Sequence, residues 1–208
     1  MSKEYRTLSQ RATFELVEKK SRFIAIAAPV QTEAQALAIL QNEKSKYPDA
    51  RHHVYAYRVR ENNLMRYSDD GEPAKTAGVP VLDILLHGEI EDAICVVTRY
   101  FGGTLLGTGG LVRAYSGAAQ GAVEAAIPAT MRPATVAKLI IDYPLLARIE
   151  NELTGKGAVI LSTEYTDKVE ILFQIVSSDY ESLCAALTEA TAGKCTPTVV
   201  EEVYKPFV

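Results

Sequence analysis

The sequence has few of the residues that build disulfide frameworks or metal sites. Its three cysteines are an odd number and none stands in CxxC spacing, which argues against a disulfide framework and a structural zinc site. The three histidines are the adjacent His52 and His53 and a lone His87, so no two have the i, i+4 spacing that places metal ligands on one helix face. We therefore expect no metal and no cofactor.

Long apolar runs and known catalytic motifs are also absent. No stretch approaches the roughly 18–20 uncharged apolar residues of a membrane helix, and the first ten residues, MSKEYRTLSQ, lack the apolar core of a signal peptide. GxSxG, HExxH and a cysteine with an evident histidine partner are missing. With 48% hydrophobic and 23% charged residues, the composition is that of a globular protein. We expect a cytoplasmic protein that contacts no membrane and is not an enzyme.

The charge is acidic overall and unevenly placed. The formal net charge is −4; residues 1–130 carry 15 Lys and Arg against 15 Asp and Glu, and residues 131–208 carry 7 against 11. An acidic protein is not steered to nucleic acid by its overall field, so binding a polyanion would need a local basic patch. Such a patch is expected in the first part of the chain.

The hydrophobic pattern predicts a second domain over residues 134–208. Strand patterns at 135–142, 158–165, 169–176 and 197–204 alternate with a helix opened by Pro144 and another that ends near Gly193. The strict alternation of apolar residues from Val169 to Ile175 is typical of a half-buried strand. The resulting βαββαβ order is ferredoxin-like.

The pattern of residues 1–130 is also mixed α and β. Strands are predicted at 12–19, 22–30, 52–60, 64–70 and 93–101, the last so apolar that both of its faces should be covered. Helices are predicted after Thr32, over the apolar residues near 79–86, and from 108 to 126. The segment AAIPATMRP, residues 125–133, contains two prolines and is predicted to be the linker.

The stretch RYFGGTLLGTGGLVRAY, residues 99–115, has the most unusual composition in the chain. It joins the apolar strand to a helix, and such a loop can direct backbone N–H groups and the positive end of the helix at an anion. Arg99 and Arg113 flank it and could contact phosphate or carboxylate. Its spacing is neither GxxxxGK[ST] nor GxGxxG, so a wide turn without a ligand is equally compatible. Gly117 and Gly121, farther along the helix, are predicted to allow close packing on the sheet.

Two further segments carry side chains that could bind a ligand or take part in catalysis. In YSDDGEPAKTAGVP, residues 67–80, Asp69, Asp70 and Glu72 could form a metal or general-base cluster, with Lys75 as counter-ion; because Asp-Asp-Gly is a strong turn signal, we favour a solvated turn.

The second of these segments is HHVYAYRVR, residues 52–60. Alternation places His53, Tyr55 and Tyr57 on one face of the expected strand and Arg58 on the other. The aromatics could stack on bases, although tyrosine is also ordinary in a half-buried strand.

Two long blocks together identify a resemblance. RYSDDGEPAKTAGVPVLDIL (66–85) followed by VVTRYFGGTLLGTGGLVRAYSGAA (96–119) resembles the signature of the IMPACT family in its bacterial, two-domain layout. The resemblance implies an N-terminal α+β domain of the βαβ type found in ribosomal proteins and in domain four of elongation factor G. It also implies a ferredoxin-like C-terminal domain similar to domain five of that factor.

The resemblance implies a role near translation. Eukaryotic members are linked to translational control in the stress response to amino-acid starvation, by competing for an activator of an initiation-factor kinase. This chain starts almost directly at the shared domain, without their additional N-terminal domain, so the kinase route is not expected. We expect a non-enzymatic binding protein that contacts RNA, the ribosome or a translation factor. The expected contact residues are Arg99, Gly102, Gly103, Gly107, Gly109, Gly110, Arg113, Lys75, Arg58 and His53.

A different class of function fits the same loop. An enzyme or sensor could bind a small phosphorylated ligand there, with Asp69, Asp70 or Glu72 assisting. That hypothesis requires a concave pocket between the two sequence blocks.

Overall fold

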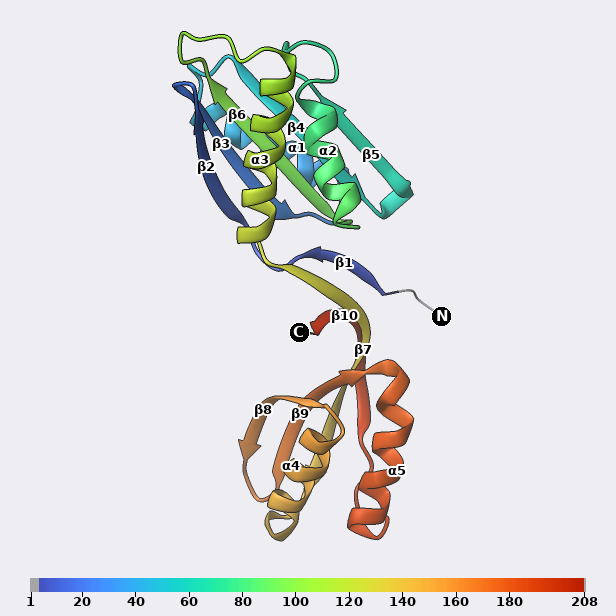
Figure 1. The fold of residues 1–208 in the computed structure, drawn as a ribbon. Helices are drawn as coiled ribbons and strands as arrows, with labels where there is room; N and C mark the ends of the chain where they lie inside the picture. The colour runs from blue at the N-terminus through green and yellow to red at the C-terminus, as the bar shows by residue number, and fades with distance from the viewer. Residues whose placement is uncertain (1–3, 208) are drawn as a thin grey trace. The chain divides into compact units, whose positions relative to one another are not determined.

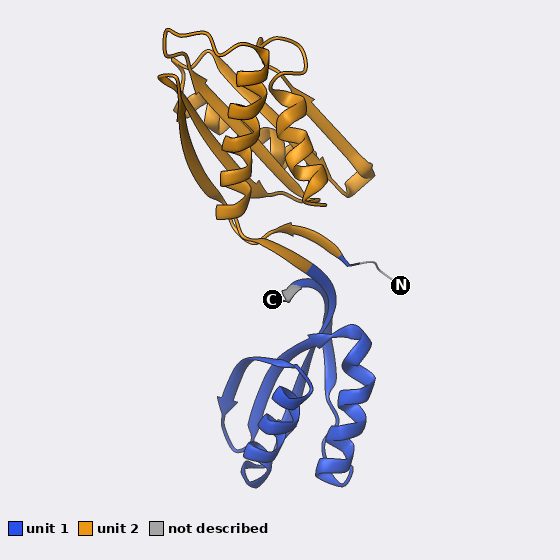
Figure 2. Ribbon diagram, in the orientation of Figure 1, with its two compact units in different colours: residues 1–4, 131–207 blue, residues 5–130, 208 orange. Residues whose placement is uncertain are grey.

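The computed structural model describes residues 4–207, which fall into two compact units. Residues 5–130 form one unit, and residues 131–207 with Glu4 form the other (Figure 2). Both combine helices with antiparallel strands, as the predicted α+β class requires. Among these residues, no helix is both long enough and apolar enough to cross a membrane.

The first unit is built on a five-stranded antiparallel sheet (Figure 1). In pairing order its strands are β2 (Ala12–Glu18), β3 (Ser21–Pro29), β6 (Ala93–Tyr100), β4 (His52–Val59) and β5 (Leu64–Ser68). The central strand β6 is buried from Ala93 to Arg99, because helices cover both faces of the sheet.

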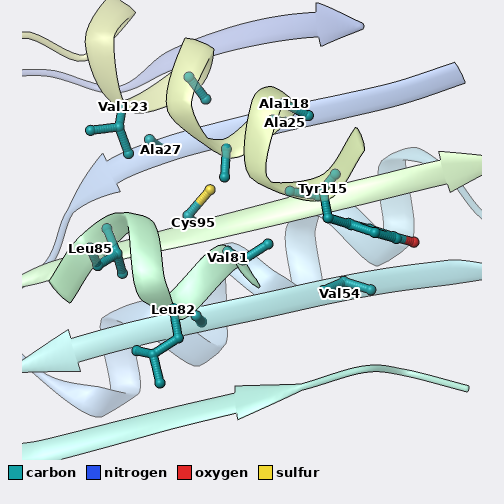
Figure 3. Close-up of a cluster of buried hydrophobic side chains, with 14 of the residues drawn as sticks. Ala25, Ala27, Val54, Val81, Leu82, Leu85, Cys95, Tyr115, Ala118 and Val123 are labelled. Atoms are coloured by element: carbon teal, nitrogen blue, oxygen red, sulfur yellow. The ribbon is translucent and has the colours of Figure 1, made fainter. Parts of the chain in front are cut away.

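Helices α2 (Gly78–His87) and α3 (Thr108–Ala125) cover one face of this sheet, and α1 (Glu33–Lys46) covers the other. Figure 3 shows the core under α2 and α3, in which Cys95 of the central strand lies between the two helices. Burial raises the pKa of the Cys95 thiol to about 12, so this cysteine behaves as a small apolar side chain. The alternation predicted for residues 52–60 is confirmed, since Val54 packs under α2 and α3 and Tyr57 packs on the α1 side.

The remaining strands form a second five-stranded sheet. In pairing order it contains β1 (Tyr5–Leu8), β7 (Pro128–Ile141), β9 (Val169–Val176) and β8 (Val159–Tyr165), with β10 (Thr198–Phe207) also paired to β7. Helices α4 (Leu146–Gly155) and α5 (Tyr180–Thr191) complete the order β7-α4-β8-β9-α5-β10. This confirms the predicted ferredoxin-like βαββαβ domain. Three short 3-10 turns lie at Glu61–Asn63, Tyr143–Leu145 and Ser177–Asp179.

The segment 125–133, predicted to be the linker, contains the boundary between the two units at residues 130 and 131, but most of it is β-strand. Strand β7 begins at Pro128 and continues without a break to Ile141. Proline is tolerated as the first residue of a strand, where no ladder hydrogen bond is lost, and Pro133 directly precedes Ala134, the first residue paired with β9. Strand β1 was not predicted either, because Tyr5–Leu8 is short and shows no clear alternation.

Candidate functional site

Four connections of the first unit meet at one end of its sheet. They are the β2–β3 turn (19–20), the α1–β4 loop (47–51), the β5–α2 loop (69–77) and the β6–α3 loop (101–107), and together we call them the loop end (Figure 1). The register places them together, because His52 at the start of β4 pairs with Arg99 near the end of β6, and Arg22 of β3 pairs with Tyr100. The two blocks that carry the family resemblance therefore converge in space.

Gly102 ties the glycine loop to the β2–β3 turn. A Cβ at this position would lie 2.0 Å from the carbonyl carbon of Lys20 and 2.3 Å from the nitrogen of Ser21. Its backbone N–H donates a hydrogen bond of 3.1 Å to the Ser21 hydroxyl. Only glycine fits this close approach, so Gly102 has a structural role that packing alone explains.

The other glycines shape the start of α3. Gly103 and Gly107 adopt positive φ angles of +81° and +73°, and a Cβ at either would meet nothing within 4 Å. Gly107 is the N-cap of α3 and no side chain caps the helix. The first backbone N–H groups of an α-helix have no partner inside the helix, so the exposed residues Thr108 and Gly109 present N–H groups and the positive end of the dipole to the surface.

Along α3, the prediction of close packing holds for one of the two glycines. A Cβ at Gly121 would lie 2.4 Å from the ring of Phe14 on β2, whereas a Cβ at Gly117 would make only an ordinary 3.5 Å contact with Leu16. Gly110, in the first turn, would meet the Cβ of Leu106 at 2.9 Å.

Arg99 and Glu72 form a buried ion pair under the glycine loop. Nη1 of Arg99 donates a 2.6 Å hydrogen bond to Oε1 of Glu72, and their side chains are only 6% and 4% exposed. The Tyr115 hydroxyl donates to the same oxygen at 2.7 Å. Burial, reinforced by Glu72, raises the pKa of Tyr115, so its phenol is a neutral donor. Arg99 is thus held by the protein, and its Nε has no hydrogen-bond partner among the described residues.

The acidic segment forms a turn, as predicted, but its carboxylates are bound by protein groups instead of being solvated. Oδ1 and Oδ2 of Asp69 together accept hydrogen bonds from the backbone N–H groups of Lys75, Ala77 and Gly78, the last at 2.7 Å, and so fix the entry to α2. Oδ2 of Asp70 accepts from the N–H of His53 at 2.6 Å. Within residues 4–207, no cluster of three or more histidine, cysteine or acidic side chains could hold a metal ion.

The two adjacent histidines point to opposite faces of the sheet. Nδ1 of His52 lies 2.8 Å from the carbonyl oxygen of Asp70, and since a carbonyl only accepts, Nδ1 carries the proton. Its Nε2 lies 3.9 Å from Oε1 of Glu72. His53 is buried against Thr98 on the α1 side, away from the glycine loop. Burial lowers the pKa of His53.

A cavity of about 470 Å³ opens between the two blocks. Its walls are largely apolar, and the buried part of its lining carries the polar side chains of His52, Glu72 and Arg99. The remaining lining residues are Arg51, Pro73, Phe101, Leu105, Leu106, Gly107, Thr108 and Leu111. A concave site of this volume is within the range of small-molecule sites.

Basic side chains without ion-pair partners surround the loop end. Within residues 4–207, the following exposed cations form no ion pair: Lys19, Lys20, Arg51, Lys75 and Arg113. The carboxylates of Asp69, Asp70 and Glu72 are engaged by protein groups, and Glu18 and Asp49 are the exposed acids adjoining the loop end.

Of the residues predicted from sequence, the structure brings Arg99, Lys75, Arg113 and the glycines to the loop end. Arg58 lies at the opposite end of the sheet, where its guanidinium donates to the carbonyl oxygen of Ile90.

Sequence reasoning missed Lys19, Lys20, Arg51, His52 and Tyr115. The Lys-Lys dipeptide in a tight hairpin turn was a usable signal, because a turn exposes its side chains. For Tyr115 there was none, since its partner Glu72 is 43 positions away in the sequence.

Comparison with known families gives two matches that divide the chain. The model of the Impact N-terminal domain matches residues 19–123, and a domain of unknown function, DUF1949, matches residues 139–194. The first match contains the whole loop end.

Individual relatives match over nearly the full length. The IMPACT family member YvyE of Bacillus subtilis is 35% identical over 93% of this chain and 90% of its own. YigZ of Escherichia coli is 34% identical over 88% of this chain and 92% of its own. A crystal structure of a hypothetical protein has a TM-score of 0.61 at 31% identity and covers 97% of this chain and 99% of that one.

Proposed function

The chain belongs to the IMPACT family, and from that premise we propose that it is a regulatory protein that binds RNA of the translation apparatus through the loop end. The RNA-binding surface comprises Lys19, Lys20, Arg51, Lys75 and Arg113 together with the N-terminus of α3. The regulatory role and the link to translation come from the family resemblance. The choice of RNA as the partner comes from the chemistry of the surface.

The observation that carries the proposal is the group of unpaired cations. A cation that is already paired gains little from a phosphate, because the new contact replaces an old one. At the loop end the acids of the 69–72 segment are engaged by backbone N–H groups and by Arg99. They therefore do not offset the positive charge of the exposed lysines and arginines. Such a patch on an acidic chain favours a polyanion locally.

The start of α3 supports phosphate binding by a second route. Thr108 and Gly109 are exposed, and a Cβ at Gly109 would contact only Nη1 of Arg113, at 3.6 Å. The absence of a bulky side chain lets a phosphate approach the unpaired N–H groups closely, with Arg113 beside it. Phosphate contacts of this kind position nucleic acid without reading its sequence.

A small phosphorylated ligand is the second candidate. The cavity of about 470 Å³ favours it, because both sequence blocks line it and α3 begins at its rim. A free nucleotide and a nucleotide within RNA would make the same phosphate contacts, so only binding measurements separate the two.

The test is a salt-dependent titration with single-stranded and structured RNA. Neutralising four phosphates of a single strand gives a slope of about −2.8 in log K against log salt. The double variant Lys19→Ala/Lys20→Ala should reduce the magnitude of that slope by about 1.4. A wild-type slope near zero would reject RNA as the partner and point to a protein partner instead.

The matched control is Arg148→Ala/Lys194→Ala in the other unit. Both residues are exposed and unpaired among the described residues, and the pair removes the same charge. It should leave the slope unchanged. Arg99→Ala is unsuitable as a test of binding, because it leaves Glu72 buried without its counter-ion.

A further inference from the structure

The walls of the cavity at the loop end are suited to a flat ring with apolar faces. Phe101 is 46% exposed and lines the cavity together with Leu106, Leu111 and Pro73. Its ring centroid lies 5.7 Å from the guanidinium carbon of Arg99, so one side of the ring is already occupied by a planar cation. An aromatic ring that remains half exposed beside a basic surface is a platform on which a base can stack.

The inner part of the cavity offers hydrogen-bond acceptors. Oε1 of Glu72 accepts from Arg99 and Tyr115, whereas Oε2 accepts no hydrogen bond from any residue in the described range. The Glu72 side chain is only 4% exposed. Oε2 is not one of the fully buried polar atoms that lack a partner, and Glu72 lines the cavity, so a donor in the cavity can reach this oxygen.

His52 adds a second acceptor beside the Glu72 carboxylate. Nδ1 donates its proton to the carbonyl oxygen of Asp70, and in the imidazole tautomer with that proton Nε2 carries a lone pair. That nitrogen lies 3.9 Å from Oε1 of Glu72. Arg99 already balances the carboxylate charge, so the complementary ligand is a neutral group with adjacent N–H donors rather than a second cation.

We propose that this cavity binds a single unpaired guanine base. Guanine has two neighbouring donors, N1–H and the N2 amino group, on its Watson–Crick edge. Adenine and cytosine place a ring-nitrogen acceptor beside the amino group, and uracil flanks its one N–H with two carbonyl oxygens, which would face the Glu72 carboxylate. The inference rests on the proposed function, because the RNA bound at the loop end is what delivers the base.

The rim of the cavity completes a nucleotide-sized site. Arg51, Gly107 and Thr108 are exposed residues that line the cavity, and there the phosphate of the same nucleotide meets an unpaired guanidinium and the N-terminus of α3. The base is then read by the inner residues and the phosphate by the rim. Enzymes and binding proteins that extrude a base read its Watson–Crick edge in a pocket of this kind.

Calorimetric titration of the full chain with GMP, AMP, CMP and UMP tests the inference. GMP should bind about 5- to 150-fold more tightly than the other three, the discrimination expected of one good bidentate contact. Equal affinities, or no detectable GMP binding, would overturn it. Guanosine without phosphate should retain the preference and lose affinity, because only the rim contacts are missing.

Three variants locate the site. Phe101→Ala should weaken GMP binding by about 5- to 150-fold, the value of one stacked base, and Phe101→Tyr should restore it. Tyr165→Ala removes an aromatic that is 60% exposed in the other unit and should change nothing. Equal loss in Phe101→Ala and Tyr165→Ala would contradict the assignment, and so would full GMP affinity in Phe101→Ala.

The two proposals fail in distinguishable ways. If RNA binds with the expected salt slope but GMP shows no preference, the guanine site is wrong and the proposed function stands. If GMP binds selectively while RNA does not bind at low salt, the RNA partner is wrong and the cavity is a site for a free nucleotide. Absence of both would reject both.

Discussion

The two ends of the first unit's sheet use their basic side chains differently. At the end opposite the loop end, the guanidinium of Arg58 contacts the carbonyl oxygen of Ile90 at 2.9 Å and a carboxylate oxygen of Glu91 at 3.3 Å. Arg60 pairs with the same Glu91. At the loop end, Lys19, Lys20, Arg51, Lys75 and Arg113 have no such partners among the described residues.

The difference lies in what the carboxylates do. Glu91 neutralises surface arginines, whereas Asp69 binds backbone N–H groups and Glu72 binds the buried Arg99. The acidic residues of the 69–72 segment are engaged inside the fold, so they do not neutralise the exposed cations of the loop end. A sheet with equal numbers of charges can therefore present a basic surface at one end only.

The largest expected effect is a loss of stability when the buried ion pair of Arg99 and Glu72 is broken. Arg99→Ala leaves Glu72 without its counter-ion in a site where the carboxylate is 4% exposed, and breaking a buried pair from one side costs about 3–5 kcal/mol. Urea denaturation of Arg99→Ala and of Arg113→Ala measures this. We expect the second variant to stay within about 0.5 kcal/mol of wild type. A loss below about 1 kcal/mol in Arg99→Ala would show that the pair does not hold the loop end together.

The next effect distinguishes a glycine of the β6–α3 loop, Gly102, from a glycine in the first turn of α3, Gly109. Gly102→Ala places a methyl group 2.0 Å from the Lys20 backbone, so the free energy of unfolding should fall by about 1–3 kcal/mol. Gly109→Ala meets only Nη1 of Arg113, at 3.6 Å, and should be neutral or slightly stabilising. Thermal denaturation of both variants is the measurement, and equal destabilisation would contradict the close approach assigned to Gly102.

A third comparison contrasts paired and unpaired cations directly. Arg58→Ala loses hydrogen bonds to Ile90 and Glu91 and should reduce the free energy of unfolding by about 1–2 kcal/mol, with the RNA salt slope unchanged. Lys19→Ala/Lys20→Ala should do the reverse, with stability within about 0.5 kcal/mol and a smaller slope. If Arg58→Ala weakened RNA binding as much as the lysine pair, the distinction between the two ends would fail.

The smallest effect is a pH dependence of stability from His53. Burial lowers the pKa of His53 in the folded state. The negative charge of Asp70 raises this pKa in part, and the positive charge of Lys44 lowers it. The unfolded chain then binds more protons below about pH 6.5, so stability falls as the pH drops through that value. His53→Gln should flatten the stability curve between about pH 7 and pH 5.5, measured by urea denaturation at each pH. An unchanged curve would show that His53 contributes nothing to it.

Local patterns sufficed for most of the fold. Alternation located β9, and the unbroken apolar run of β6 predicted a strand covered on both faces. The strand predicted at 135–142 covers the second half of β7, but its first half was missed, because two prolines resemble a linker until their positions in the ladder are known.

The candidate site was predicted less completely than the fold. The glycine loop was found from its composition, but its partners were not, because Arg99 and Glu72 stand 27 positions apart. The sequence left Asp69, Asp70 and Glu72 as either a metal or general-base cluster or, as we favoured, a solvated turn. In the fold, each of these three carboxylates binds a different partner, and the pairing register of β4 and β6 determines which partners they meet. No local sequence signal encodes a register between distant strands.

The most direct test of the central claim is an NMR titration of the ¹⁵N-labelled chain with single-stranded RNA at low salt. The expected result is that amide shifts concentrate in residues 19–22, 51–53, 72–76 and 101–113. Shifts concentrated around residues 58–65 and 90–92, or in residues 131–207, would contradict the assignment of the binding surface to the loop end.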